Sequence, residues 1–347
     1  MNSDITDIRV LVVEDCGWRR DATRKALESL PGICVVALVG TGEDAVRTAL
    51  ELGPAVITMG VEMAELGGLS AIEEIMARCP TPIVIIGSTK QAPEGFGVDA
   101  LRRGALDFVA ARTGSGLDAD LLMARVRICA RVAVITHPRS RRLTAGGSSL
   151  GNTQGYQVVG VAVSTGGPPA LQSILSRLPE TFPVPVIVVQ HIPKGFSEGL
   201  TSFLDANCHM SVVEAVDGAK LEPGVVYVAP AGYHVVVTRH RRIELLDSGF
   251  EECHHMPSAD VMLRSLADVY GSRAVGIIMT GMGRDGVDGI RAIREAGGLT
   301  LAQDEESSLI YGMNKVATEA GWIRHVVPLK ELAGRLISLW GDGGQGG

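Results

Sequence analysis

The stretch VVGVAVSTGGPP at residues 158–169 decides the fold class of the region around it. An apolar run of this kind is typical of a buried strand, and a helical pattern at 171–178 begins directly after the two prolines, which suit a helix's first turn. The two glycines allow the sharp turn in between. A strand that turns at once into a helix predicts an α/β fold. Ser164 then lies at the carboxyl edge of the sheet, where such folds bind ligands, beside amides able to hold an anion.

Length and composition fit two α/β domains. The chain has 347 residues, of which 46% are hydrophobic and 4% aromatic. A formal net charge of −7 argues against nucleic acid as a partner. We expect no membrane insertion, because no apolar run has the length of a membrane span and the start MNSDITD is not a signal peptide. The six cysteines form no C-x-x-C motif, which indicates reduced, structural thiols and a cytoplasmic protein.

Strand and helix patterns alternate in both halves of the chain. Between them the stretch HPRSRRLTAGGSSLGNTQGY at 137–156 has the composition of a linker. We therefore predict two doubly wound parallel sheets. The predicted limits are a first domain at 1–134, a linker at 135–156, a second domain at 157–341 and a disordered tail at 342–347. Apolar runs in the second domain also predict a hairpin that turns at His240–Arg241.

Three strand ends of the second domain carry complementary polar side chains. Ser164 ends one strand, His191 ends the strand PVPVIVVQH, and Asp285 lies in the loop after the strand AVGIIMT. Parallel strands bring their carboxyl ends together, so these groups could meet as nucleophile, base and orienting acid. Each alone also has a structural interpretation: Ser164 and Asp285 as helix caps, and His191 as a buried core histidine. Asp288 competes with Asp285 for the acidic role.

Several segments match one protein family in the same order. They are STGGP at 164–168, QHIPKGF at 190–196, VYVAPAGYH at 226–234, PSAD at 257–260, TGMGRDG at 280–286, AQDE at 302–305 and YGM at 311–313. Residues 158–335 thus resemble the catalytic domain of the CheB protein-glutamate methylesterases of chemotaxis, which has a Rossmann-like fold. The resemblance implies Ser164 as nucleophile, His191 as general base and Asp285 as the group that orients the base. It also implies an oxyanion pocket at Thr165, Met282 and Gly283.

The activity implied by this resemblance is hydrolysis of a glutamate γ-methyl ester on a methylated chemoreceptor, and many relatives also deamidate glutamine. It implies no cofactor and no metal. His254 and His255 are adjacent, but they lack the partner spacing of a zinc site. His234 and Asp260 fit a role at the rim of the site and an ordinary structural role equally well. Met256 stands where the family usually has an arginine.

The first domain resembles a response regulator receiver, a flavodoxin-like fold, over residues 8–112, but it departs from the receiver's phosphorylation site. The acidic pair that holds Mg²⁺ in receivers is present as Glu14 and Asp15. The positions expected for the phosphoacceptor aspartate, the hydroxyl residue and the lysine are Gly60, Gly87 and Ala111. Glycine has no carboxylate to phosphorylate, and two carboxylates alone bind Mg²⁺ weakly. We therefore predict a pseudo-receiver, with either constitutive esterase activity or control by a protein partner bound to this domain.

Two other functions fit parts of the sequence. A non-enzymatic adaptor that only binds receptors would suit the degenerate first domain, but the intact Ser164, His191 and Asp285 argue against it. A nucleotide phosphate loop at 164–167 would need the lysine of the G-x-x-x-x-G-K-[ST] motif, which the sequence lacks. A demethylation assay separates enzyme from adaptor, and a nucleotide titration tests the second alternative.

Overall fold

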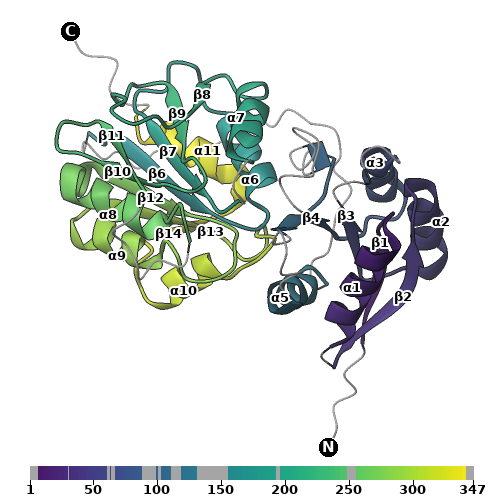
Figure 1. The fold of residues 1–347 in the computed structure, drawn as a ribbon. Coiled ribbons are helices and arrows are strands. Elements are labelled where there is room, and N and C mark those ends of the chain that lie inside the picture. The colour runs from purple at the N-terminus through teal and green to yellow at the C-terminus, as the bar shows by residue number, and fades with distance from the viewer. Residues whose placement is uncertain are drawn as a thin grey trace, which may run out of the picture. The chain divides into compact units, whose positions relative to one another are not determined.

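The chain divides into two compact units, Met1–Arg141 and Arg142–Gly347, and each is described by itself. A computed structural model (Figure 1) describes residues 7–29, 31–60, 63, 67–87, 99–100, 103–110, 119–130, 155–192, 196–247 and 255–340. Most of the predicted linker and the whole predicted tail at 342–347 lie outside these residues. The domain limits 1–134 and 157–341 therefore stay predictions.

The first unit contains a sheet of five strands. They are β1 (Ile8–Val13), β2 (Ile33–Val39), β3 (Val56–Gly60), β4 (Ile83–Gly87) and β5 (Asp107–Ala110). All pairings are parallel, and the strand order is β2-β1-β3-β4-β5. This order is that of flavodoxin-like folds, so the predicted fold class is confirmed for this half.

Helices cover both faces of this first sheet. Helix α1 (Gly17–Glu28) contacts α5 (Ala119–Cys129), and α2 (Gly42–Leu52) contacts α3 (Gly68–Arg78), with one pair on each face (Figure 1). Every residue of β3 is buried, as expected for a parallel strand covered on both faces. The strand order reverses between β1 and β3, so the carboxyl ends of these two strands lie where such sheets bind ligands.

The second unit contains a sheet of seven strands, all paired in parallel. They are β6 (Val158–Val163), β7 (Val186–Gln190), β8 (Ser211–Glu214), β9 (Val225–Val228), β12 (Ala274–Ile278), β13 (Leu299–Gln303) and β14 (His325–Val327). Their order is β14-β13-β12-β6-β7-β9-β8, which confirms the second predicted doubly wound sheet. Strands β7, β8 and β9, which follow β6 in the chain, lie on one side of it, with β8 at the edge and β9 between β7 and β8. Strands β13 and β14, which follow β12, lie on the other side, so the order reverses between β6 and β12.

The predicted hairpin is also confirmed. Strands β10 (His234–Val237) and β11 (Ile243–Leu246) pair antiparallel as a separate two-stranded sheet. The turn between them includes Arg241, whose backbone has a positive φ of 58°. The hairpin packs against helix α8 (Ala259–Tyr270), which a short 3-10 helix, η2 (Gly271–Arg273), follows.

The remaining helices of the second unit form two layers over its sheet (Figure 1). In one layer α6 (Gly167–Leu175) contacts α7 (Ser197–Asp205) and α11 (Leu329–Ser338). In the other, α9 (Val287–Glu295) contacts α8 and α10 (Met313–Glu319). The sequence patterns did not predict α10 and β14. No helix in the described ranges is long and apolar enough to cross a membrane.

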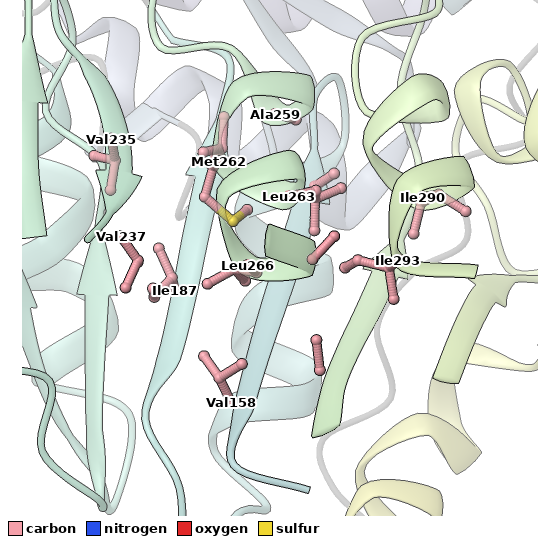
Figure 2. Close-up of a cluster of buried hydrophobic side chains, with 14 of the residues drawn as sticks. Val158, Ile187, Val235, Val237, Ala259, Met262, Leu263, Leu266, Ile290 and Ile293 are labelled. Carbon is pink, nitrogen blue, oxygen red and sulfur yellow. The ribbon is translucent and has the colours of Figure 1, made fainter. Parts of the chain in front are cut away.

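A buried apolar cluster fixes α8 against the sheet. Figure 2 shows Met262, Leu263 and Leu266 of α8 beside Val158 of β6 and Ile187 of β7, and all five side chains are fully buried or nearly so. Burying one such side chain stabilises the fold by about 1.5–3 kcal/mol. This packing determines where the first turn of α8 lies relative to the strand ends.

Candidate active site

Ser164 is the first residue after β6 and is only 2% exposed. Its N–H donates to the Thr280 carbonyl at 3.0 Å, and its own carbonyl accepts from the Gly167 N–H at 2.8 Å. Helix α6 begins at Gly167 and has Gly166 as its N-cap, in the left-handed region at φ 79°. The Ser164 hydroxyl therefore does not cap this helix, and the interpretation of Ser164 as a helix cap is wrong.

His191 is the first residue after β7, the strand next to β6. Its N–H donates to the Val163 carbonyl at 3.1 Å, which continues the register in which Val163 pairs with Gln190. The Thr280 carbonyl that binds Ser164 follows β12 on the other side of β6. Ser164, His191 and the loop after β12 thus meet at the point where the strand order reverses, as in other open α/β sheets that bind ligands there.

Gln190 ties the backbones of Ser164 and His191 together. Its side chain is buried, and its Nε2 donates to the Ser164 carbonyl at 2.9 Å and to the His191 carbonyl at 3.1 Å. This role of Gln190 was not predicted from the sequence. The available signal was a polar side chain at the end of an otherwise apolar strand, directly before the candidate base.

His191 and Asp285 form a short, buried pair. His191 Nε2 lies 2.6 Å from Asp285 Oδ2, and the two side chains are 7% and 11% exposed. An ionised carboxylate only accepts hydrogen bonds, so the ring proton belongs on Nε2. His191 Nδ1 is then the basic nitrogen, and it is buried without a hydrogen-bond partner among the described residues. In this structure it is therefore not bonded to Ser164. The nucleophile–base bond is often long before substrate binds.

The N-terminus of α8 holds Asp285 in its ionised form. Asp285 Oδ1 accepts from Ser258 Oγ at 2.6 Å and from the Asp260 N–H at 3.0 Å, and Oδ2 accepts from the Ala259 N–H at 2.7 Å. Burial by itself raises the pKa of Asp285. The hydrogen bond and electrostatic interaction with His191, together with the hydrogen bonds from Ser258 and Ala259, outweigh burial and hold this pKa well below its usual range.

The three residues expected at the oxyanion pocket have different surroundings. Thr165 is buried, and its carbonyl accepts a hydrogen bond from Thr280 Oγ1 at 2.9 Å. Met282 is exposed, and Gly283 has a left-handed backbone at φ 100°. A Cβ added at Gly281 would lie 2.6 Å from the Ser164 Cβ. The loop that carries Gly281, Met282 and Gly283 therefore packs directly against Ser164.

The other acidic candidates have structural partners. The Asp288 side chain is 42% exposed and pairs with Arg264 at 3.5 Å and with Arg291 at 3.4 Å. Asp260 Oδ1 accepts from the N–H groups of Gly286 at 2.9 Å and Gly289 at 2.7 Å, and so ties α8 to α9. Burial raises the pKa of Asp260 to about 6.

Three other histidines lie in or near this segment: His234, His254 and His255. His234 is buried, and its Nδ1 accepts from the Ser258 N–H at 3.2 Å. Burial lowers its pKa, partly offset by the charge of Asp285. His255 is exposed and stacks on the His191 ring, whereas His254 lies outside the described residues. Among the described residues no three His, Cys, Asp or Glu side chains gather as ligands for a metal ion.

In the first unit the acidic pair lies after β1, near the end of β3. Glu14 is buried, and its Oε1 accepts from Arg19 Nε at 3.1 Å, while Asp15 Oδ1 pairs with Arg19 Nη2 at 3.2 Å. Burial and a hydrogen bond with Asp15 raise the pKa of Glu14 to about 7 against the lowering effect of Arg19. Gly60 ends β3 and Gly87 ends the adjacent β4. Ala111 lies outside the described residues.

Comparisons with known proteins agree with this organisation. Residues 159–336 match the family described as CheB methylesterase, and residues 10–115 match the response regulator receiver domain. A protein-glutamate methylesterase/protein-glutamine glutaminase of Paramagnetospirillum magneticum is 39% identical over 345 residues, covering 96% of both chains. One of Thermotoga maritima is 34% identical over 342 residues, covering 96% of this chain and 98% of the relative.

A solved structure supports the same relationship. The crystal structure of the CheB methylesterase catalytic domain of Thermotoga maritima superposes with a TM-score of 0.51 at 35% sequence identity. It covers 53% of this chain and 98% of that domain. The chain therefore belongs to the CheB methylesterase family, and it joins an N-terminal response regulator receiver domain to a C-terminal CheB catalytic domain.

Proposed function

We propose that this chain, as a protein-glutamate methylesterase/protein-glutamine glutaminase of chemotaxis, uses Ser164, His191 and Asp285 to hydrolyse glutamate methyl esters on methylated chemoreceptors. The observation that carries the proposal is the 2.6 Å bond between His191 Nε2 and Asp285, which leaves His191 Nδ1 buried and without a hydrogen-bond partner among the described residues. A base oriented by a carboxylate, next to a serine at a strand end, is the arrangement that acyl transfer requires.

The proposed reaction has two steps. Ser164 Oγ attacks the ester carbonyl while His191 Nδ1 takes the hydroxyl proton, and Asp285 stabilises the imidazolium that forms. The carbon–oxygen bond to the methoxy group then breaks, and His191 returns the proton so that methanol leaves. Water, activated by the same nitrogen, next cleaves the acyl-enzyme to give glutamate and free Ser164. With glutamine as substrate the same steps release ammonia.

The oxyanion of the tetrahedral intermediate needs hydrogen-bond donors close to Ser164. Thr165 follows the nucleophile directly, and Met282 and Gly283 belong to the loop that packs against it. We assign the oxyanion pocket to the backbone between these positions. Removing one such donor in other enzymes lowers turnover by about 10²–10³.

The direct test is release of labelled methanol from a methyl-labelled chemoreceptor by the full chain. Ser164→Ala and His191→Gln should lose at least about 10³-fold in turnover, because each removes one member of a cooperating group. His240→Ala is the matched control, since His240 is exposed in the hairpin turn. If Ser164→Ala keeps wild-type activity, the serine mechanism is refuted. If the wild-type chain releases no methanol yet binds the receptor, the adaptor is the better description.

We also propose that aspartyl phosphorylation does not control this enzyme. Gly60 and Gly87 end adjacent strands where a receiver needs a carboxylate and a hydroxyl. The Glu14 side chain, which follows the neighbouring strand β1, also lies where a side chain at Gly60 would be. A Cβ added at Gly60 would lie 2.9 Å from the Glu14 Cδ and closer still to its Oε2. Glu14, held by Arg19, thus occupies the volume that a side chain at Gly60 would need.

The proposal implies a receiver domain that aspartyl phosphorylation does not switch. Either the catalytic domain is constitutively active, or a protein partner bound to the first domain takes over control. Incubation with acetyl phosphate and Mg²⁺ should leave methanol release unchanged, and no phosphate should map to residues 1–134. Stimulated activity with a phosphorylated residue in that range would contradict the proposal. Gly60→Asp alone should not restore phosphorylation, because Glu14 already fills the site.

A further inference from the structure

The ring of His255 lies flat against the ring of His191. The ring centroids are 4.3 Å apart and the planes differ by 14°. From the sequence, His255 was considered only as a metal ligand, and this contact was not predicted. The stack covers one face of the imidazole that the proposed mechanism uses as its base.

His255 belongs to the same short segment that holds the catalytic carboxylate. Three residues further on, Ser258 donates its hydroxyl to Asp285, and the N–H groups of Ala259 and Asp260 also bind that side chain. The segment is anchored by the bond between the Met256 carbonyl and the Gly232 N–H at 3.3 Å. Residues 255–260 therefore contact both members of the histidine–aspartate pair.

The bond to Asp285 leaves one motion of the His191 ring weakly restricted. Rotation of the imidazole about its Cβ–Cγ bond has broad preferences. Nε2 lies near this axis, so the hydrogen bond at Nε2 opposes the rotation less than a contact on the ring face does. Nδ1 lies further from this axis than Nε2 does, so turning the ring changes the direction in which Nδ1 can accept a proton. A flat group stacked on the ring is the restraint that this motion requires.

We infer that His255 is a positioning residue, which keeps the His191 ring plane in the orientation that directs Nδ1 toward Ser164; this inference rests on the proposed serine mechanism. His255 acts in this role through its flat ring, which stacks on the His191 ring. Because the orientation of the base matters in the chemical step, its loss should lower kcat and leave KM largely unchanged.

The test compares His255→Ala with His255→Phe in the full chain, with labelled methanol from a methyl-labelled chemoreceptor as the readout. We expect His255→Ala to lower kcat by about three- to tenfold, the size of one aromatic contact, with KM within about twofold. His255→Phe keeps a flat ring and should retain most of the wild-type kcat. His240→Ala, an exposed histidine elsewhere on the second unit, should change neither constant.

The possible results separate this inference from the function on which it rests. If Ser164→Ala stays active, the serine mechanism fails whatever His255 does. If Ser164→Ala is inactive while His255→Ala keeps full kcat, only the positioning role is overturned. A His255→Phe variant as slow as His255→Ala also overturns it, because a ring nitrogen and not the stack would then be required. Equal melting temperatures for the variants exclude loss of folding as the cause.

Discussion

Replacing Asp285 by asparagine tests the hydrogen-bond geometry of the site. Oδ1 accepts from Ser258 Oγ and the Asp260 N–H, and Oδ2 accepts from His191 Nε2 and the Ala259 N–H. Every partner is a donor, as an ionised carboxylate requires. An asparagine turns one of the two oxygens into an NH₂ group. In either orientation, one backbone N–H then faces another donor.

The expected magnitudes follow from these contacts. A buried N–H without an acceptor costs about 1–3 kcal/mol of stability. If the NH₂ faces His191, the ring must carry its proton on Nδ1, and that nitrogen can no longer accept the proton of Ser164. The corresponding tautomer change in another serine hydrolase lowers turnover about 10⁴-fold. We expect kcat of Asp285→Asn to fall by about 10³- to 10⁴-fold, and its free energy of unfolding to fall by about 1–3 kcal/mol.

The assay is labelled-methanol release, combined with urea unfolding of the same preparations. Asp288→Asn is the matched control, because the Asp288 side chain is 42% exposed on the same loop–helix segment and pairs at the surface with Arg264 and Arg291. Such pairs are worth about 0–1 kcal/mol, so this variant should behave as wild type. A folded Asp285→Asn protein with kcat within tenfold of wild type would refute the reasoning.

Two further substitutions test the packing behind each unit's strand ends. Gly281→Ala would place a Cβ 2.6 Å from the Ser164 Cβ and 2.5 Å from the Met313 Sδ. The free energy of unfolding in urea should fall by about 1–3 kcal/mol, and kcat should fall as well. Unchanged values of both would count against close packing at this position. Burial raises the pKa of Glu14 from 4.5 to about 7. Between pH 4.5 and pH 7 the folded state therefore binds more protons than the unfolded chain, and the free energy of unfolding should fall by about 3 kcal/mol as the pH rises across this range. Urea unfolding of Glu14→Gln at pH 5 and pH 8 should lack this fall, and an identical pH slope in both proteins would show that Glu14 is not its source.

The sequence was sufficient to predict both sheets because their strands are short apolar runs separated by turn residues. The strand β6 and the turn into α6 have every feature used for that prediction: buried β-branched residues, two glycines and two prolines. Helix α10 and strand β14 were missed for the same physical reason. They span only 7 and 3 residues, too few for a hydrophobic period to be recognised.

Part of the candidate site could likewise be predicted from the sequence, and part could not. Residues at the ends of parallel strands could be paired from the sequence, because register alone brings Ser164 next to His191. Strand spacing alone could not decide between Asp285, which the family resemblance implied, and Asp288, because that choice depends on how the loop before α9 turns at Gly283 and Gly286, both with left-handed backbones. The contacts from residues 255–260 depend on the packing of α8, and no local pattern reports them.

The two sheets of this chain show why the fold alone does not determine chemistry. Both have parallel strands whose order reverses beside the first strand of the unit, and both place polar residues at that edge. In the second unit, Ser164 and His191 directly follow the adjacent strands β6 and β7, and we propose that these two groups exchange a proton. In the first, two of the adjacent strands end in Gly60 and Gly87, and the side chain of Glu14 fills the space. A side chain at Gly60 would therefore require the carboxyl end of Glu14 to shift, so the two positions are coupled.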